Sequence, residues 1–172
     1  MKDIARQSMS IKVESMDLLN AQIKMEAHAS ATYLAMASWC EQNGFFTSAK
    51  FFFKQSEEER GHMMKIFKFL VDTGGSPISP EITNIYHDYA SIVDVFENTL
   101  EHEVKVTKSI HNIVKKTRDL GDITAERFLD WFVMEQVEEE NTIRDILDMI
   151  AVTGTEGVGQ QMIDNQVANW IK

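Results

Sequence analysis

Four glutamates interrupt apolar stretches of helical period, at positions where a side chain would face the protein interior. They are Glu26, Glu59, Glu103 and Glu139. An ionised carboxylate in an apolar interior is strongly unfavourable unless it is paired or neutralised. No Lys or Arg stands at a matching position, so multivalent cations are the expected compensation.

Two further potential ligands share these inward faces. His62 follows Glu59 by three residues, and Gln136 precedes Glu139 by three, a spacing that places each pair on one side of a helix. Carboxylate oxygens combined with one imidazole suit iron or manganese better than copper or thiolate-bound zinc. The pattern therefore predicts a carboxylate-rich metal centre.

Long helices must position these groups, because glycine and proline are confined to a few places. The apolar period predicts helices over 10–40, 47–72, 91–120 and 124–152, and a short fifth helix is indicated by Met162, Val167 and Ile171. Thr47, Ser91 and Thr124 are the expected N-caps, and Gly74, Gly121 and Gly154 are expected near the C-caps. Strand alternation is absent from the sequence.

Connection lengths predict the topology and bring the glutamates to one level. The connections near Gly44 and Gly121 are short, whereas 73–90 contains both prolines and is long enough to return along a helix. Glu26 and Glu59 lie 18 and 15 residues from Gly44, and Glu103 and Glu139 each lie 18 from Gly121. The four carboxylates are therefore expected to meet near the middle of a four-helix bundle with one long crossover.

Composition limits the class of protein. The 172 residues suffice for a single domain, 1–172, and the formal net charge of −10 disfavours nucleic acid and anionic membranes as partners. No apolar stretch has the length of a membrane helix, and the N-terminal sequence lacks the apolar region of a signal peptide. The single cysteine, Cys40, fits a reducing compartment, so a cytoplasmic location is expected.

The residues themselves leave alternatives open. One glutamate in an apolar stretch often lies at its solvated edge, and a metal-free helical interaction protein would place such acids at subunit interfaces. Four interruptions at one level favour the metal centre. An oxidase that uses two irons without storing mineral is a further alternative.

The motifs resemble the ferroxidase centre of bacterial non-haem ferritins over nearly the whole chain. The resemblance is carried by Glu26, the run Glu58-Glu59-Arg60-Gly61-His62, Glu103, and the run Glu135-Gln136-Val137-Glu138-Glu139. Leu19-Asn20, Gln22, Tyr33, Ser38-Trp39-Cys40 and Trp131 are similar as well. The resemblance implies an all-α, ferritin-like four-helix bundle with one long crossover and a short fifth C-terminal helix.

The resemblance also implies a role for each motif residue. A first iron would bind Glu26, Glu59 and His62; a second would bind Glu103 and Glu139, with Glu59 bridging and Gln136 at or beside the second iron. A third, storage-side iron would use Glu58, Glu135 and Glu138. Tyr33 and Trp131 would lie close enough to donate electrons. The implied activity is oxidation of Fe(II) by dioxygen or peroxide and storage of Fe(III) oxyhydroxide in a cage of 24 identical subunits.

Departures from neighbouring families narrow the prediction. Haem-binding bacterioferritins have a methionine where Arg60 stands, and a second Glu-x-x-His motif where Glu139 is followed by Thr142, so no haem is expected. One cysteine cannot build the iron module of a rubrerythrin. Asp119, Asp122 and Glu126 are expected to form an ordinary capped helix corner rather than an entry channel. Surface or hydrogen-bonded roles are expected for His28, His87, His102 and His111.

Overall fold

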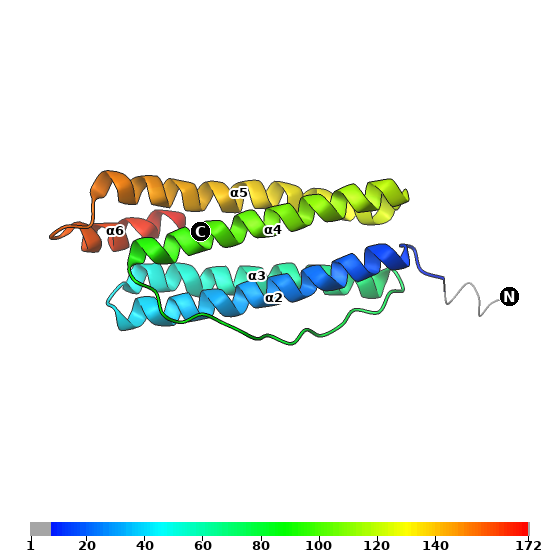
Figure 1. Ribbon diagram of the computed structural model, residues 1–172, viewed down its shortest axis with the longest axis horizontal. Coiled ribbons are helices and arrows are strands. Elements are labelled where there is room, and N and C mark those ends of the chain that lie inside the picture. Colours follow the sequence, from blue (N-terminus) through cyan, green and yellow to red (C-terminus); the bar gives the residue numbers. More distant parts are fainter. Residues whose placement is uncertain (1–7, 172) are drawn as a thin grey trace.

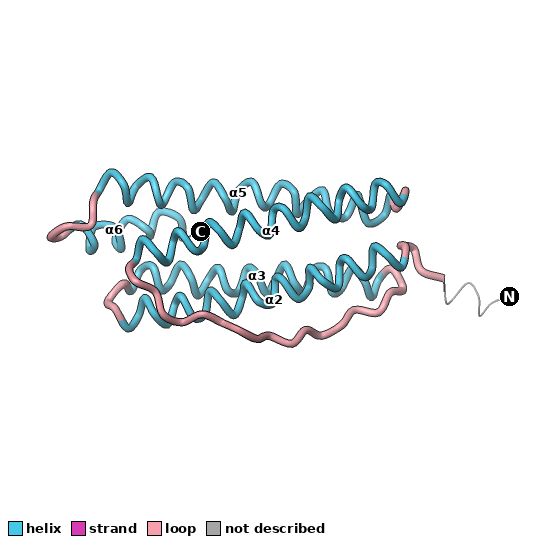
Figure 2. The backbone as a smooth tube through the Cα atoms, in the orientation of Figure 1, coloured by secondary structure: helices cyan, strands magenta, loops and turns pink. Residues whose placement is uncertain are grey.

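The computed structural model describes residues 8–171, and the only regular secondary structure in that range is helical (Figures 1 and 2). The elements are α2 (Val13–Gln42), α3 (Phe46–Asp72), α4 (Ile92–Leu120), α5 (Ile123–Thr153), α6 (Gly159–Val167) and a 3₁₀ turn, η1 (Ala168–Trp170). The predicted all-α class is confirmed. No helix within the described range is both long and apolar enough to cross a membrane.

Two helical hairpins form the bundle, and a long crossover joins them. Figure 1 shows α2 and α3 as one antiparallel pair, α4 and α5 as the other, and the segment 73–91 running the length of the bundle along its outside, on the α2 side. Asn20 on α2 fixes part of the crossover: its Oδ1 accepts from Ile78 N at 2.8 Å, and its Nδ2 donates to the Ser76 carbonyl at 3.2 Å. The predicted topology is confirmed.

The short C-terminal helix packs across one end of the bundle, against α3 and α5 (Figure 1). Ile163 and Val167 are its buried apolar residues, whereas Met162, expected to face inward, is about half exposed. Asp164 of α6 is buried and accepts from Thr47 N at 3.0 Å and Ser48 N at 2.7 Å. A side chain more than 100 residues away in sequence therefore satisfies the first free N–H groups of α3.

Helix ends agree with the predictions in part. Ser91 is the N-cap of α4 and its hydroxyl accepts from Asp94 N at 3.1 Å. Gly121 ends α4 in the left-handed conformation, with φ of 66°. The other two expected N-caps are wrong: α3 begins after Phe45 and α5 after Asp122. Thr47 lies inside α3, where Asp164 supplies the cap, and the Asp122 carboxylate caps α5 two residues before Thr124.

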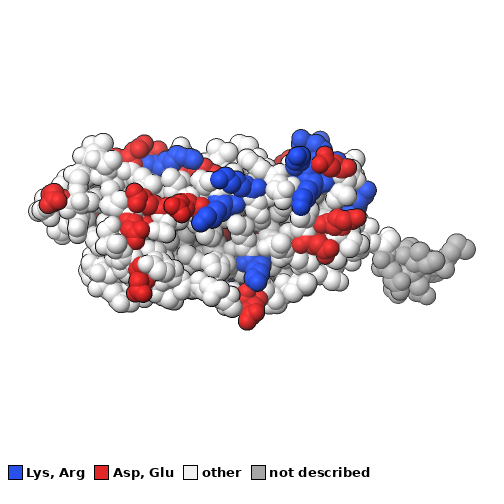
Figure 3. Space-filling model, in the orientation of Figure 1, with Lys and Arg blue, Asp and Glu red and all other residues white. Residues whose placement is uncertain are grey.

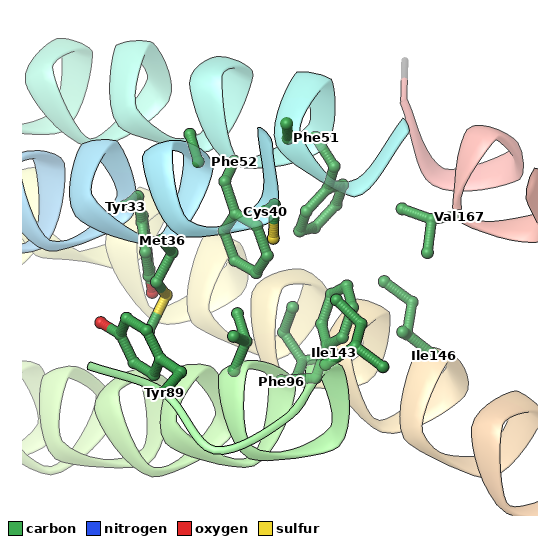
Figure 4. Close-up of a cluster of buried hydrophobic side chains, with 14 of the residues drawn as sticks. Tyr33, Met36, Cys40, Phe51, Phe52, Tyr89, Phe96, Ile143, Ile146 and Val167 are labelled. Carbon is green, nitrogen blue, oxygen red and sulfur yellow. The ribbon is translucent and has the colours of Figure 1, made fainter. Parts of the chain in front are cut away.

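The bundle core consists of two apolar clusters separated along the helix axes. One contains Tyr33, Met36, Phe52, Phe96 and Ile143, near the end that α6 covers (Figure 4). The other contains Leu19, Ile23, Ile66, Ile110 and Leu129, near the α4–α5 turn. On each long helix, the predicted site residue lies between the residues that contribute to these clusters. The carboxylates thus form a buried polar layer with apolar packing on both sides.

The face shown in Figure 3 carries charges of both signs, with a group of Lys and Arg side chains over the end where α4 turns into α5. The buried acids are the unusual feature of this molecule.

Candidate metal centre

The structure brings the six predicted inner residues together in the polar layer. Their exposed fractions are 1% for Glu26, 2% for Glu59, 7% for His62, 1% for Glu103, 3% for Gln136 and 7% for Glu139. Each of the four long helices supplies at least one of them. Acidic side chains are almost never this buried without a partner, so the layer requires a compensating charge or proton.

Glu26, Glu59 and His62 form the first potential ligand group. One ligand atom of each lies within 4.8 Å of the others, and His62 Nδ1 is 3.3 Å from Glu59 Oε2. Glu26 Oε1 accepts a 2.8 Å hydrogen bond from Gln22 Nε2, one turn earlier on α2. Two carboxylates and one imidazole nitrogen converge on a common point, as an iron site requires.

Glu103 and its partners form the opposite side of the layer. The Tyr33 hydroxyl donates to Glu103 Oε1, and Gln136 Nε2 donates to Glu103 Oε2 at 3.0 Å. These contacts bring α2 and α5 to a carboxylate of α4. Gln136 therefore lies beside the position predicted for the second iron and orients one of its expected ligands.

His62 belongs to a second potential ligand group as well. One of its ring nitrogens, a carboxylate oxygen of Glu135 and one of Glu139 lie within 4.8 Å of one another, and Nε2 is 3.8 Å from Glu135 Oε1. The imidazole thus has Glu59 on one nitrogen and Glu135 on the other. In the neutral ring only one nitrogen carries a proton, so the two carboxylates compete to set its tautomer.

Burial and mutual repulsion raise the carboxyl pKa values throughout the layer. Burial is the largest cause for Glu26 and Glu59, whose pKa values lie well above the ordinary range. Burial, followed by the charge of Glu103, raises the pKa of Glu139 to about 8. Burial likewise raises the pKa of Glu103, against the hydrogen bonds from Tyr33 and Gln136. Without cations the layer therefore retains protons at neutral pH, and bound cations would displace them.

The three acids predicted for a third site lie outside the buried layer. Glu58, Glu135 and Glu138 line a cavity of about 50 Å³ that also reaches Glu139. The other lining residues are Phe51, Lys54, Gln55, Thr142 and Trp170. Gln55 donates to Glu58, and Lys54 Nζ lies 3.6 Å from the same carboxylate. Trp170 was missed by sequence reasoning, because nothing in the local pattern indicates that η1 folds back onto α3.

Two aromatic side chains near the layer have different surroundings. Tyr33 is fully buried, and burial, followed by the charge of Glu103, raises its pKa well above the ordinary value. Trp131 is 39% exposed, and its ring centroid is 5.4 Å from that of His62. Lys65 Nζ lies 3.5 Å from the Trp131 ring centroid, a cation–π contact. Only Tyr33 contacts a predicted ligand by a hydrogen bond.

The acids near the α4–α5 turn have structural partners. Asp122 accepts from Ala125 N at 3.1 Å and from Lys12 N at 2.7 Å, while Glu126 pairs with Arg118 at 2.9 Å. These contacts agree with the predicted capped corner.

One of the unassigned histidines, His102, is partly buried, and its Nδ1 is buried without a hydrogen-bond partner among the described residues. The expected surface or hydrogen-bonded role is therefore not met at this nitrogen. The His102 ring lies 6.4 Å from that of His28 and edge-on to Tyr33. Burial, followed by the neighbouring His28, lowers its pKa to about 4, so the ring is neutral at physiological pH.

Comparison with known proteins agrees with this geometry. Residues 16–152 match the family of ferritin-like domains, and the chain belongs to that family. Among curated relatives, it is 40% identical to a probable bacterial non-haem ferritin-like protein of Haemophilus influenzae, over 88% of this chain and 92% of that one. It is 36% identical to the bacterial non-haem ferritin of Campylobacter jejuni, over 91% and 93% of the two chains.

A solved structure gives the same result. The open-pore ferritin of the archaeon Archaeoglobus fulgidus superposes with a TM-score of 0.89 at 32% identity, covering 92% of this chain and 97% of that one. The predicted resemblance to non-haem ferritins is thereby confirmed.

Proposed function

We propose that this ferritin is an iron-storage protein that oxidises Fe(II) at the buried polar layer and stores the Fe(III) product. Iron is here a substrate that enters and leaves. One observation carries the proposal: four buried carboxylates and an imidazole converge with no Lys or Arg among the buried residues that the structure describes. Divalent cations supply the missing charge, and iron suits this combination of oxygen and nitrogen donors.

Each residue has a proposed role. Glu26, Glu59 and His62 bind the first Fe(II), while Glu103 and Glu139 bind the second beside Gln136. Glu59 lies between the two and bridges them. This division is supported by the 4.8 Å group around His62 and Glu59 and by the separate contacts of Glu103.

The proposed reaction removes one electron from each of two Fe(II) ions. Dioxygen takes up both electrons and two protons to give hydrogen peroxide, and peroxide is the alternative oxidant. The carboxyl groups of the layer lose their protons as Fe(II) binds. Their pKa values are raised in the absence of a counter-charge, and the bound cation supplies that charge and favours the ionised carboxylates. Tyr33 can supply one of the two electrons in place of an Fe(II) ion, and its hydroxyl proton is then one of the two protons that dioxygen takes up.

Glu58, Glu135 and Glu138 form a third iron site on the way to storage. The position of Glu135 supports this role, because it lies between His62 and the outer cavity. The Glu135 carboxylate can therefore contact an Fe(III) ion that leaves the buried layer, because the same side chain also lines the outer cavity.

Storage requires an assembled shell. We propose a cage of 24 identical subunits in the cytoplasm, with the whole chain, 1–172, as one ferritin-like domain and no bound haem. Exposed apolar side chains on several elements, among them Ile78 and Tyr86 of the crossover and Met134 and Val137 of α5, provide surface for contacts between copies.

The test is anaerobic addition of Fe(II) to the metal-free protein, then air, with iron per subunit and particle mass measured together. Many irons per subunit in a large particle support storage. Glu59→Ala should lose fast oxidation, whereas Glu57→Ala, an exposed neighbour on the same helix, should keep it. Binding that stops near two or three irons on a small oligomer would indicate an oxidase without storage, and no binding would refute the metal centre.

A further inference from the structure

Gln22 of α2 has a buried side-chain amide that connects the metal layer to α4. This helix supplies no ligand to the first potential ligand group, which consists of Glu26, Glu59 and His62. Gln22 is 1% exposed and lies one turn before Glu26 on α2. Its Nε2 donates to Glu26 Oε1 at 2.8 Å, and its Oε1 accepts from the Ser109 hydroxyl of α4 at 2.6 Å. Both ends of the amide are therefore engaged.

The ionised Glu26 carboxylate determines which way the amide points, because it can only accept a hydrogen bond. The Gln22 Nε2 group therefore faces Glu26, and the amide oxygen faces α4. The Ser109 hydroxyl, which can donate or accept, donates to that oxygen and holds the amide in this orientation. If the amide turned around, its oxygen would face the Glu26 carboxylate, and two acceptors would meet in a buried site.

The consequence for Glu26 is a fixed carboxylate with one oxygen left for a cation. Oε1 is held by Gln22, whereas Oε2 is buried and receives no hydrogen bond from any residue in the described range. Glu59 and His62 each place a ligand atom within 4.8 Å of a Glu26 carboxylate oxygen. The Gln22 N–H group donates to Oε1 and thus favours the carboxylate form of Glu26 that a metal needs.

The opposite side of the layer has the same device. Gln136 Nε2 donates to Glu103 Oε2 at 3.0 Å, so an amide holds one terminal carboxylate on each side. Gln136 was predicted to lie at or beside the second iron, whereas Gln22 was part of the family similarity but had no predicted role.

We infer that Gln22, held by Ser109, is a positioning residue that orients Glu26 for the first Fe(II). This inference rests on the proposed function, since it assigns a partner to one ligand of that site. The hydrogen bond favours binding through a single oxygen of Glu26 and preorganises the first site before iron arrives.

The experiment is anaerobic Fe(II) titration of the assembled protein by calorimetry, followed by initial oxidation rates over a range of Fe(II) concentrations. Gln22→Leu should weaken one of two binding steps by about 10- to 100-fold and leave the other unchanged. The Fe(II) concentration for half-maximal rate should rise, with the maximal rate close to wild type. Ser109→Ala should act in the same direction but less, and Ser109→Thr, which keeps the hydroxyl donor, should restore binding.

Thr99→Val is the matched control. Thr99 is a buried α4 hydroxyl that donates to the Val95 carbonyl at 2.9 Å, away from the metal layer. Unchanged affinities in Gln22→Leu would overturn the inference, as would a parallel weakening of both steps that Thr99→Val shares. Wild-type protein that binds no Fe(II) would refute the proposed function itself, a result visible without any variant.

Discussion

Replacing Glu139 by glutamine should stabilise the metal-free protein, and the gain should grow with pH. Glu139 is 7% exposed, and its pKa is raised to about 8 by burial and then by the charge of Glu103. Glutamine keeps the size and shape of the side chain but cannot ionise. The variant thus removes one buried charge while leaving the packing of α5 intact.

The magnitude follows from the pKa. A shift from the ordinary value of 4.5 to about 8 corresponds to at most about 5 kcal/mol, at about 1.4 kcal/mol per pH unit. Between these two pH values the folded state holds a proton on Glu139 that the unfolded chain has lost. Wild-type stability therefore falls as pH rises through this window, and the contribution is fully present only below pH 4.5.

Chemical denaturation at several pH values would measure the effect. Metal-free wild type and Glu139→Gln are unfolded in guanidinium chloride between about pH 5 and pH 8, with chelator present and subunit concentration fixed, because assembly alters apparent stability. The two should differ little at the acidic end and by several kcal/mol at the alkaline end. Glu57→Gln, at an exposed position of α3, controls for removal of a surface charge.

Parallel pH profiles for wild type and Glu139→Gln would refute the assignment of a buried, protonated carboxyl. Anaerobic Fe(II) supplies a second check. Cation binding should stabilise wild type more than the variant, because the lost carboxylate is a proposed ligand. If Fe(II) stabilises both equally, Glu139 does not bind the second iron.

Two further predictions concern residues around the layer. Tyr33→Phe should slow the oxidation phase about tenfold in stopped-flow measurements at saturating Fe(II), and should also weaken the second Fe(II) binding step, because the hydroxyl that donates to Glu103 is lost. An unchanged rate at saturating Fe(II) would exclude Tyr33 as an electron donor. Asp164→Ala should lower the free energy of unfolding by about 1–3 kcal/mol, because Thr47 N and Ser48 N lose their acceptor. Asp148→Ala, at an exposed position of α5, is the control for thermal denaturation, and equal melting temperatures for the two variants would contradict the capping role.

The sequence predicted the fold and the inner group because both depend on helical spacing. Glu59 and His62, three residues apart, must share a face, and similar distances of the four glutamates from Gly44 and Gly121 bring the two hairpins' acids to one level. Such relations follow from the regular geometry of the helix, so they survive errors of several residues at helix ends.

Features that depend on distant contacts could not be predicted in the same way. Thr47 is a good N-cap by type, yet Asp164 caps α3 from the other end of the chain. Trp170 reaches the outer acids only because α6 folds across the bundle. Gln22 lay within the recognised similarity, but its partner Ser109 is 87 residues away and no local pattern links the two.

The two apolar clusters explain how the bundle tolerates its polar layer. Each long helix extends through both clusters, so the packing of residues such as Phe96 on one side and Ile110 on the other fixes the helices whether or not iron is present. Hydrogen bonds from Gln22, Tyr33 and Gln136 then hold the carboxylates in place. Because apolar packing at both ends stabilises the fold, the layer can keep buried acids that oppose folding and become favourable only when iron binds.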